Sequence, residues 1–356
     1  MDYTGLAISI LKALVVFFMV LNTVPVLVWA ERRGSAFIQH RLGPNRVNIA
    51  GFTLFGLVQP LADVVKFMWK EEYVPAHANR NFYLLAPLLL LIPAATTFAV
   101  VPFADTLEIG GRVITMQVAN LNIGILFVFA LASISVYGVA LAGWSSNNKY
   151  SFLGAIRSGA QMISYELALG LSVLGILMIY GSIELDGIVR EQGELLFGVL
   201  PKWGIVTQPL AFVLFIVAIF AESNRLPFDL PEAESELVVG YHTEYSAMKF
   251  ALFFMAEYMA MVTGAMLIVT LFFGGWQIPW VSSEALRAVV GPIPAVLLQL
   301  GSFSAKLLFF LWLFIWVRWT LPRFRYDQLM NLGWKVVLPL AIANVFVTAI
   351  VLILIR

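Results

Sequence analysis

The sequence predicts an all-α integral membrane protein with eight transmembrane helices and amphipathic surface helices in its first long loop. Of its 356 residues, 61% are hydrophobic and only 12% are charged, and the mean hydropathy is +0.89. Soluble domains are about half apolar and about a quarter charged. No polar stretch is long enough to fold separately beside the apolar segments. We therefore expect residues 1–356 to form a single membrane domain.

Apolar runs define the predicted spans, because a helix needs about 20 residues to cross a hydrocarbon core of about 30 Å. The fifth run is the shortest, and Pro209 near its start leaves its boundary the least defined. The start MDYTGLAISI has no basic region and no small-residue cleavage site follows it, so we expect the first run to remain as a span. The predicted spans are residues 6–29, 82–104, 121–143, 160–181, 205–221, 246–273, 295–317 and 334–355.

The distribution of Lys and Arg predicts the orientation of the spans. The loops after spans 1, 3, 5 and 7 contain 15 Lys and Arg residues, whereas the other connections contain four. Positive residues mark the cytoplasmic or matrix side of a membrane. We therefore expect loops 30–81, 144–159, 222–245 and 318–333 on that side. Both termini should lie on the opposite side, which is periplasmic if the protein belongs to a bacterial inner membrane.

The first of these loops contains a further apolar pattern, GFTLFGLVQPLADVVKFMWKEEY. Apolar residues recur at helical spacing between Phe52 and Met68, but charges such as Asp63 and Lys66 interrupt the run. This pattern favours a helix lying along the membrane surface over a ninth span. Pro60 is expected to kink that helix or to split it in two.

Carboxylates gather in the loop after span 5. Seven of the 21 acidic residues fall within residues 222–257, among apolar residues as in LPFDL and ELVVGY. Charge runs are often only hydrated faces, but these apolar neighbours predict that the loop packs against other parts of the molecule. Asp229 and Glu232, with a proline between them, have the spacing of a helix N-cap and capping box. Glu232 and Glu236 share a face of a helix, whereas Glu234 joins them on a strand, and the sequence leaves both open.

Three ionisable residues fall inside predicted spans. Glu257 lies about ten residues into span 6, which places it about 15 Å deep at 1.5 Å per residue. Glu166 lies in span 4, and Lys306 lies in span 7 on one polar stripe with Gln299 and Ser302. A carboxylate near the bilayer centre costs at least about 2.5 kcal/mol, so a functional role is the default interpretation. Coupled buried carboxylates are what a proton path needs; the alternative is that each is a static neutral or paired group.

A basic cluster, WAERRGSAFIQHRLGPNR, follows span 1. Anchoring to lipid headgroups explains Arg33 and Arg46, but it explains the adjacent Glu31 and Arg32 poorly. The chain has no Cys and three widely separated His residues, which excludes cysteine-held clusters and disulfides within it and argues against a haem or metal site. Any electron chemistry must then belong to partner proteins.

Five segments carry a resemblance to a known family: AERRGSAFIQHRLGPNR, LVQPLADVVKFMWKE, GAQMISYELALGLSVLG, AESNRLPFDLPEAESELVVGYHTEYSAMKFALFFMAEY and RWTLPRFRYDQLMNLGWK. They resemble the H subunits of bacterial proton-translocating NADH:quinone oxidoreductases (respiratory complex I) and their mitochondrial counterpart, NADH dehydrogenase subunit 1. The resemblance covers nearly the whole chain and is weakest near residues 104–118, 183–204 and 276–293. It implies an eight-span subunit at the joint between the membrane arm and the redox arm, where its loops and surface helices close the membrane end of a quinone chamber.

The resemblance also implies roles for individual residues. Those expected to line or guard the quinone chamber are Arg32, Arg41, Asp63 and Phe228. Those expected to link the chamber to the membrane interior, or to form the proton path there, are Glu31, Glu166, Glu222, Arg225, Asp229, Glu232, Glu234, Glu236, Glu244 and Glu257. Lys306 is a further candidate because of its place in span 7. Ala233 and Ala247 stand where the family more often has Gly, and neither removes a titratable group.

The function implied by the resemblance is that of a non-redox subunit of an H+-translocating NADH:quinone oxidoreductase in a bacterial inner membrane, or in the mitochondrial inner membrane. Ubiquinone or menaquinone is the expected substrate. NADH, FMN and iron–sulfur clusters are expected on partners, which would be the two quinone-site subunits of the redox arm and the small and antiporter-like membrane subunits. We expect no metal, no nucleic acid and no catalysis by the isolated chain.

Two alternative functions remain open. The first is the homologous membrane subunit of a membrane-bound hydrogenase or of another quinone-linked dehydrogenase, against which the intact ERR and QHRLGPN motifs argue. The second is an independent secondary transporter, which would be built from internal repeats. The sequence has no clear repeat, so the quinone enzyme is favoured.

Overall fold

The computed structural model describes residues 3–109, 111–196, 198–230 and 234–355, and it is predominantly helical. Within these ranges, seven helices are long and apolar enough to cross a membrane. The fifth predicted span corresponds to a shorter apolar helix, α8. The helices that match the predicted spans are α1 (Tyr3–Ile38), α3 (Arg80–Thr96), α4 (Gly124–Ser145), α5 (Lys149–Tyr180), α8 (Pro209–Glu222), α10 (Ala247–Phe272), α12 (Pro292–Thr320) and α14 (Leu338–Ile355).

Two helices extend well beyond the apolar runs that predicted them. α1 continues past residue 29 to Ile38, and α5 begins at Lys149, so most of the predicted loop 144–159 is helical. The side chain of Asn148 caps α5 by accepting a hydrogen bond from the backbone N–H of Tyr150 at 2.9 Å. Hydropathy reports the apolar part of a helix, not its end, so polar turns that protrude from the bundle are missed.

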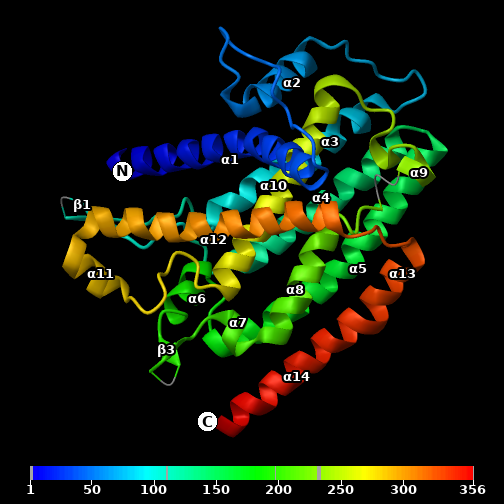
Figure 1. The fold of residues 1–356 in the computed structure, drawn as a ribbon. Helices are drawn as coiled ribbons and strands as arrows, with labels where there is room; N and C mark the ends of the chain where they lie inside the picture. Colours follow the sequence, from blue (N-terminus) through cyan, green and yellow to red (C-terminus); the bar gives the residue numbers. More distant parts are fainter. Residues whose placement is uncertain (1–2, 110, 197, 231–233, 356) are drawn as a thin grey trace.

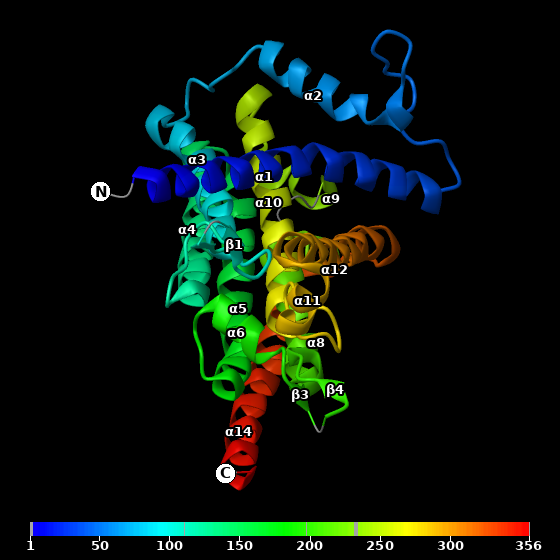
Figure 2. The same cartoon turned by 90° about the vertical axis from the view of Figure 1, so that its left-hand side faces the viewer.

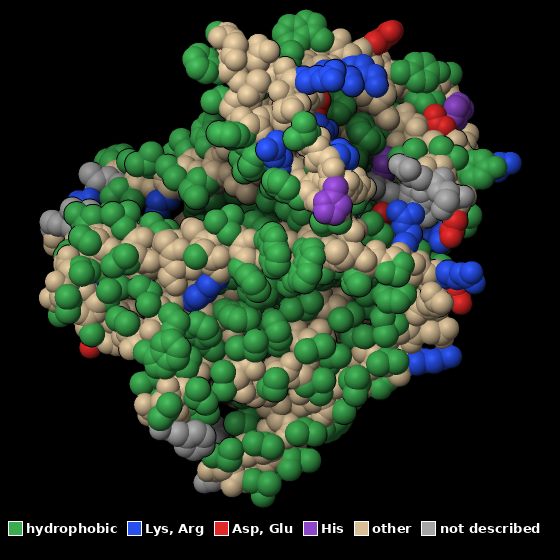
Figure 3. Space-filling view, in the orientation of Figure 1, with side chains coloured by type: hydrophobic (Ala, Val, Ile, Leu, Met, Phe, Trp, Pro, Cys, Tyr) green, Lys and Arg blue, Asp and Glu red, His purple; other side chains and the backbone are tan. Residues whose placement is uncertain are grey.

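The long helices form one bundle that α1 crosses. In Figure 2, α10 runs along the bundle, α1 passes over it, and α12 is seen nearly end on. In Figure 1, α2 (Val58–Trp69), α9 (Glu234–Leu237) and α13 (Tyr326–Leu332) lie toward the upper right, whereas both termini lie toward the lower left. The surface over α1, α12 and α14 is largely hydrophobic, and Lys and Arg gather toward α2, α9 and α13 (Figure 3). The molecule therefore has one strongly basic end.

The predicted break in the surface helix falls at a different residue. Pro60 neither kinks nor splits α2, because it is the third residue of the helix, where its missing N–H has no helical acceptor. The chain instead turns at Phe55 and Gly56, whose φ angles are 55° and 90°, in the short 3-10 helix η1 (Leu54–Gly56). The prediction for Pro60 was wrong because apolar periodicity does not show where a helix begins.

A close backbone contact joins α5 to the acidic loop. An added Cβ at Gly154 would lie 2.8 Å from the Cα of Gly240, which opens the 3-10 helix η3 (Gly240–His242). Gly240 has a φ of 64°, a conformation that glycine adopts without strain. Two glycines thus allow η3 to rest directly on α5.

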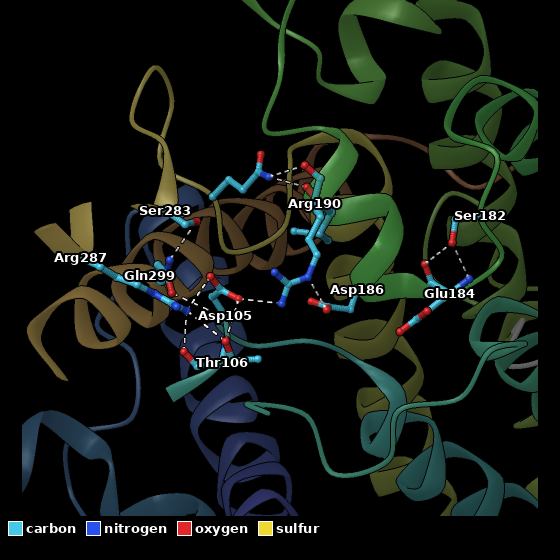
Figure 4. Close-up of polar contacts among 11 residues, drawn as sticks. Asp105, Thr106, Ser182, Glu184, Asp186, Arg190, Ser283, Arg287 and Gln299 are labelled. Atoms are coloured by element: carbon cyan, nitrogen blue, oxygen red, sulfur yellow. Dashed lines mark hydrogen bonds and ion pairs between the residues drawn. The ribbon is translucent and has the colours of Figure 1, made fainter. Parts of the chain in front are cut away.

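The end of the bundle opposite the basic end is tied together by a buried carboxylate (Figure 4). Asp105 Oδ1 lies 2.7 Å from Nη2 of Arg190, and its Oδ2 lies 2.7 Å from Nη2 of Arg287. The backbone N–H of Asp105 donates to Gln299 on α12 at 3.1 Å. The remaining elements are η2 (Thr97–Val100), β1 (Leu107–Ile109), β2 (Arg112–Ile114), α6 (Leu185–Glu191), β3 (Leu195–Leu196), β4 (Leu200–Pro201), α7 (Gly204–Thr207), α11 (Ser283–Val290) and the π-helix η4 (Gly333–Val337).

Candidate functional site

Arg225, in the turn after α8, lies at the centre of a buried network of ion pairs. Its side chain is 2% exposed; its Nη1 lies 3.0 Å from Glu31 Oε2, and its Nε lies 3.0 Å from Glu257 Oε1. The guanidinium carbon lies 4.3 Å from the centre of the Tyr258 ring, whose hydroxyl donates to Glu31 Oε2 at 2.8 Å. One cation is therefore shared by two carboxylates that different helices, α1 and α10, supply.

A second arginine completes the charge balance of this network. Nη1 of Arg318, near the end of α12, lies 2.5 Å from Glu31 Oε1. Burial alone disfavours the charged form of Arg225, but Glu257 and Glu31 more than offset this, and the net effect raises its pKa. Arg225 thus stays charged, and two guanidiniums neutralise two carboxylates. Such pairing is what makes burial of four charges tolerable.

The turn that carries Arg225 is held by a side chain of α5. The buried amide of Gln161 donates from Nε2 to the carbonyl oxygens of Ala221 and Phe228, both at 2.7 Å. Within the turn, the Phe228 N–H donates to the carbonyl oxygen of Arg225 at 2.8 Å. These bonds close residues 221–228 into a compact turn and direct Arg225 toward α1 and α10.

Asp229 extends the network toward the basic end of the molecule. Its Oδ2 accepts a hydrogen bond from Arg323 Nη2 at 2.7 Å, while its side chain is only 6% exposed. Burial raises the pKa of Asp229 to about 6; the charge of Glu257 acts in the same direction, and Arg323 and Arg318 act against it. Asp229 therefore exchanges its proton within about one pH unit of neutrality and senses the charge of Glu257.

A cavity of about 80 Å³ lies between α3, α4, α5, α8 and α10. Its wall includes two carboxylates, Glu222 and Glu257, and the polar side chains of Ser223 and Asn224. This volume and these polar groups are sufficient for a few water molecules. Glu222 also interacts electrostatically with Glu166, which accepts a hydrogen bond from Ser133 Oγ. The acids of α5, α8 and α10 thus come together around one polar cavity.

Comparison with known proteins identifies the family of the chain. The sequence profile described as NADH dehydrogenase matches residues 11–349. The chain belongs to the NADH dehydrogenase family. Similar relatives include NADH-quinone oxidoreductase subunit 8 of Rhodothermus marinus, which is 51% identical over 95% of this chain and 96% of its own length. Two H subunits of NADH-quinone oxidoreductases are also similar. That of Geobacter metallireducens, the first of its H subunits by name, is 50% identical over 98% of both chains. That of Bdellovibrio bacteriovorus is 46% identical over 99% of this chain and 97% of its own length.

These relatives confirm the resemblance and support the quinone enzyme over the hydrogenase. Each is named as a subunit of an NADH-quinone oxidoreductase, and each aligns over nearly its full length. A membrane protein of this family is also what the seven long apolar helices of the described residues indicate.

The family's predicted chamber residues lie at the basic end, but they do not form one contact group. Arg32 Nη1 lies 2.6 Å from Asp63 Oδ2, which joins α1 to α2. Arg41 is exposed and donates to Gln39 at 2.7 Å. Phe228 is buried against other aromatic rings. The first pair alone connects the surface helix to the residue that adjoins Glu31.

The acidic loop is helical where Glu234 and Glu236 lie, since α9 spans Glu234–Leu237. Glu232 and Ala233 lie outside the described residues, so the predicted capping box is not described, and the Asp229 side chain binds Arg323 instead. Glu236 is about half exposed and pairs with Arg157 at 2.7 Å. Glu244 accepts a hydrogen bond from Asn148 Nδ2 at 2.6 Å. These two acids bind residues around α5 rather than Arg225.

Lys306 is engaged at the other end of α10. Its ammonium group donates to the carbonyl oxygens of Phe273, Gly275 and Gln277 at 2.8, 2.9 and 2.6 Å. It also lies 4.7 Å from the ring centre of Trp203. Its three donors thus bind the chain that follows α10, where free carbonyl groups attract a cation.

Several residues of the site were not identified from sequence. Tyr258 follows Glu257 directly, which was the available signal for it. Arg318 and Arg323 were counted only as orientation charges, although a buried acid requires a cation nearby. His242 was noted only as an isolated histidine. It is 3% exposed, its ring nitrogens have no hydrogen-bond partner among the described residues, and burial lowers its pKa to about 4.

Proposed function

We propose that the chain is the membrane subunit through which an NADH:quinone oxidoreductase complex binds quinone and couples its reduction to proton movement. The observation that carries this proposal is Arg225, a buried cation shared by Glu31 and Glu257 and adjoined by Asp229, which titrates near pH 6. An isolated structural pair would need one partner. A shared cation between three acids instead forms a set whose charge states depend on one another.

In this proposal the quinone head group is reduced near the basic end, where Arg32, Arg41 and Asp63 guard its chamber. Reduction consumes two protons and creates transient negative charge at the head group. That charge alters the field at Asp229, whose proton is exchangeable at a cost of about 1.4 kcal/mol per pH unit. Because Asp229 senses Glu257, the change continues through Arg225 to the acids around the cavity, Glu222 and Glu166.

The membrane topology belongs to the same proposal. The chain crosses the membrane eight times, with α7 and α8 together as the fifth span, since residues 204–222 would measure about 28 Å along a helix axis. The break between α7 and α8 lies at Gln208, whose side chain bonds Asn344 and Thr348 at 2.8 and 2.7 Å. The basic end faces the cytoplasm or matrix, with α2 along the membrane surface, and both termini face the other side. NADH, FMN and the iron–sulfur clusters bind partner subunits.

The test is substitution within the network of the assembled complex. Glu257→Gln and Glu236→Gln are expected to abolish proton translocation coupled to quinone reduction, because each removes one titratable group from the path. The exposed Glu71→Gln serves as the matched control. Protons moved per electron pair are measured in liposomes that contain the complex. An unchanged ratio in Glu257→Gln would refute the proposed path.

A further inference from the structure

α2 is fastened to α1 beside the residue that binds Arg225. Asp63 of α2 pairs with Arg32 at 2.6 Å, and Arg32 directly follows Glu31. The indole N–H of Trp29 on α1 donates to the carbonyl oxygen of Phe55 in η1 at 3.0 Å. Two contacts therefore hold the start of α2 against the inner end of α1.

The other end of α2 is fastened to α10. Glu72 Oε2, three residues after α2, lies 2.7 Å from Nζ of Lys249 in the first turn of α10. The Lys249 side chain is only 10% exposed, and Glu72 is about half exposed. The Phe67 and Phe250 rings pack beside this pair, with centres 6.3 Å apart. Lys249 precedes Glu257 by eight residues, or about 12 Å along the helix.

These contacts close a ring of connections. α2 joins α1 to α10 on the outside of the bundle, and Arg225 joins the same two helices inside it. Both of the Arg225 distances are 3.0 Å, near the upper end for a charge-assisted contact. A relative shift of α1 and α10 by about 1 Å would therefore break one of the two pairs.

We propose that α2 is a bridge that sets the separation of α1 and α10, and that Glu72 and Lys249 are the positioning residues that let Arg225 bind Glu31 and Glu257 together. The inference rests on the proposed function, because it assigns to α2 the control of the same network. An occupant of the chamber that displaces α2 thereby changes which carboxylate Arg225 binds.

The test uses reversal of charge in the assembled complex. An ion pair with one half-exposed partner favours the bridged arrangement by up to about fivefold. Glu72→Lys and Lys249→Glu are each expected to lower the protons moved per electron pair, and the double variant should restore the ratio to within about twofold of the unmodified enzyme. Glu71→Lys places the same charge one residue away and should leave the ratio unchanged. Complex content is normalised by NADH oxidation with a soluble acceptor, and Glu72→Gln against Glu71→Gln repeats the comparison if a charge-reversal variant fails to assemble.

The outcomes separate this inference from the proposed function. A loss in each single variant with restoration in the double variant supports the bridge. Less assembled complex with an unchanged proton ratio would show that the pair only stabilises the fold, and this overturns the bridge, as does an equal loss in Glu71→Lys. Glu257→Gln is measured in the same preparation: if it also leaves the ratio unchanged, the proposed function has failed, whereas a loss confined to Glu257→Gln overturns the bridge alone.

Discussion

The titration of Asp229 is the most direct measure of how the loop and the membrane interior are connected. Burial raises its pKa from 3.8 to about 6, and a difference of about 2 pH units corresponds to about 3 kcal/mol. Because the folded pKa lies above the unfolded value, the native state holds more protons between these two values. The contribution of Asp229 to stability is therefore fully present below pH 4 and is lost as the pH rises through 6.

Two substitutions should move this titration in opposite directions. Arg323→Gln removes the cation at 2.7 Å from Asp229 and should raise the midpoint by about 1 pH unit, the lower end of the usual range because Arg323 is about a third exposed. Glu257→Gln removes a negative charge that raises the pKa of Asp229, so the midpoint should fall below 6. Arg325→Gln removes an equal charge from an exposed position nearby and should leave the midpoint unchanged.

The assay is infrared difference spectroscopy of the purified complex, which follows the carbonyl band of a protonated carboxyl group as the pH changes. Asp229→Asn assigns the band by removing it. A midpoint near 4 in the unmodified protein would refute the claim that burial dominates. A fall in Arg323→Gln, or a rise in Glu257→Gln, would refute the electrostatic connection between Asp229 and Glu257.

Three further predictions concern stability. Burial lowers the pKa of His242 to about 4, so the unfolded state gains the proton first as the pH falls, and about 3 kcal/mol should be lost between pH 6.5 and 4; His242→Phe should remove this loss from thermal unfolding curves, and an unaltered acid dependence would contradict the assignment. Gly154→Ala should destabilise the complex by about 1 to 3 kcal/mol because its Cβ would meet the Gly240 backbone, whereas Gly170→Ala, which meets no atom within 4 Å, is the matched control; equal effects in thermal unfolding would exclude the close contact as the cause. Lys306→Met should cost about 3 kcal/mol or more because three carbonyl groups lose their donor, yet the surviving enzyme should move as many protons per electron pair; a lower ratio would show that Lys306 belongs to the path.

Much of the fold could be predicted because the membrane imposes its constraints locally. Apolar runs located the long helices, and the charges that interrupt the run near Asp63 indicated that α2 is not a span. The same local signals failed at the helix ends. The polar first turns of α5 carry no hydropathy signal, and a proline near the start of a helix, such as Pro60, reads the same as one that breaks it.

The order of residues alone establishes that this chain is a membrane protein, where its helices run, and that several carboxylates lie too deep to be incidental. It also carries the motifs that place the chain in the NADH dehydrogenase family. Which charges meet is settled only by the packed molecule. Glu31 and Arg225 are 194 residues apart, and Asp229 and Arg323 are 94 residues apart. An ion pair depends on a few ångströms between side chains, and that separation is set by the packing of whole helices, which no local pattern of residues encodes.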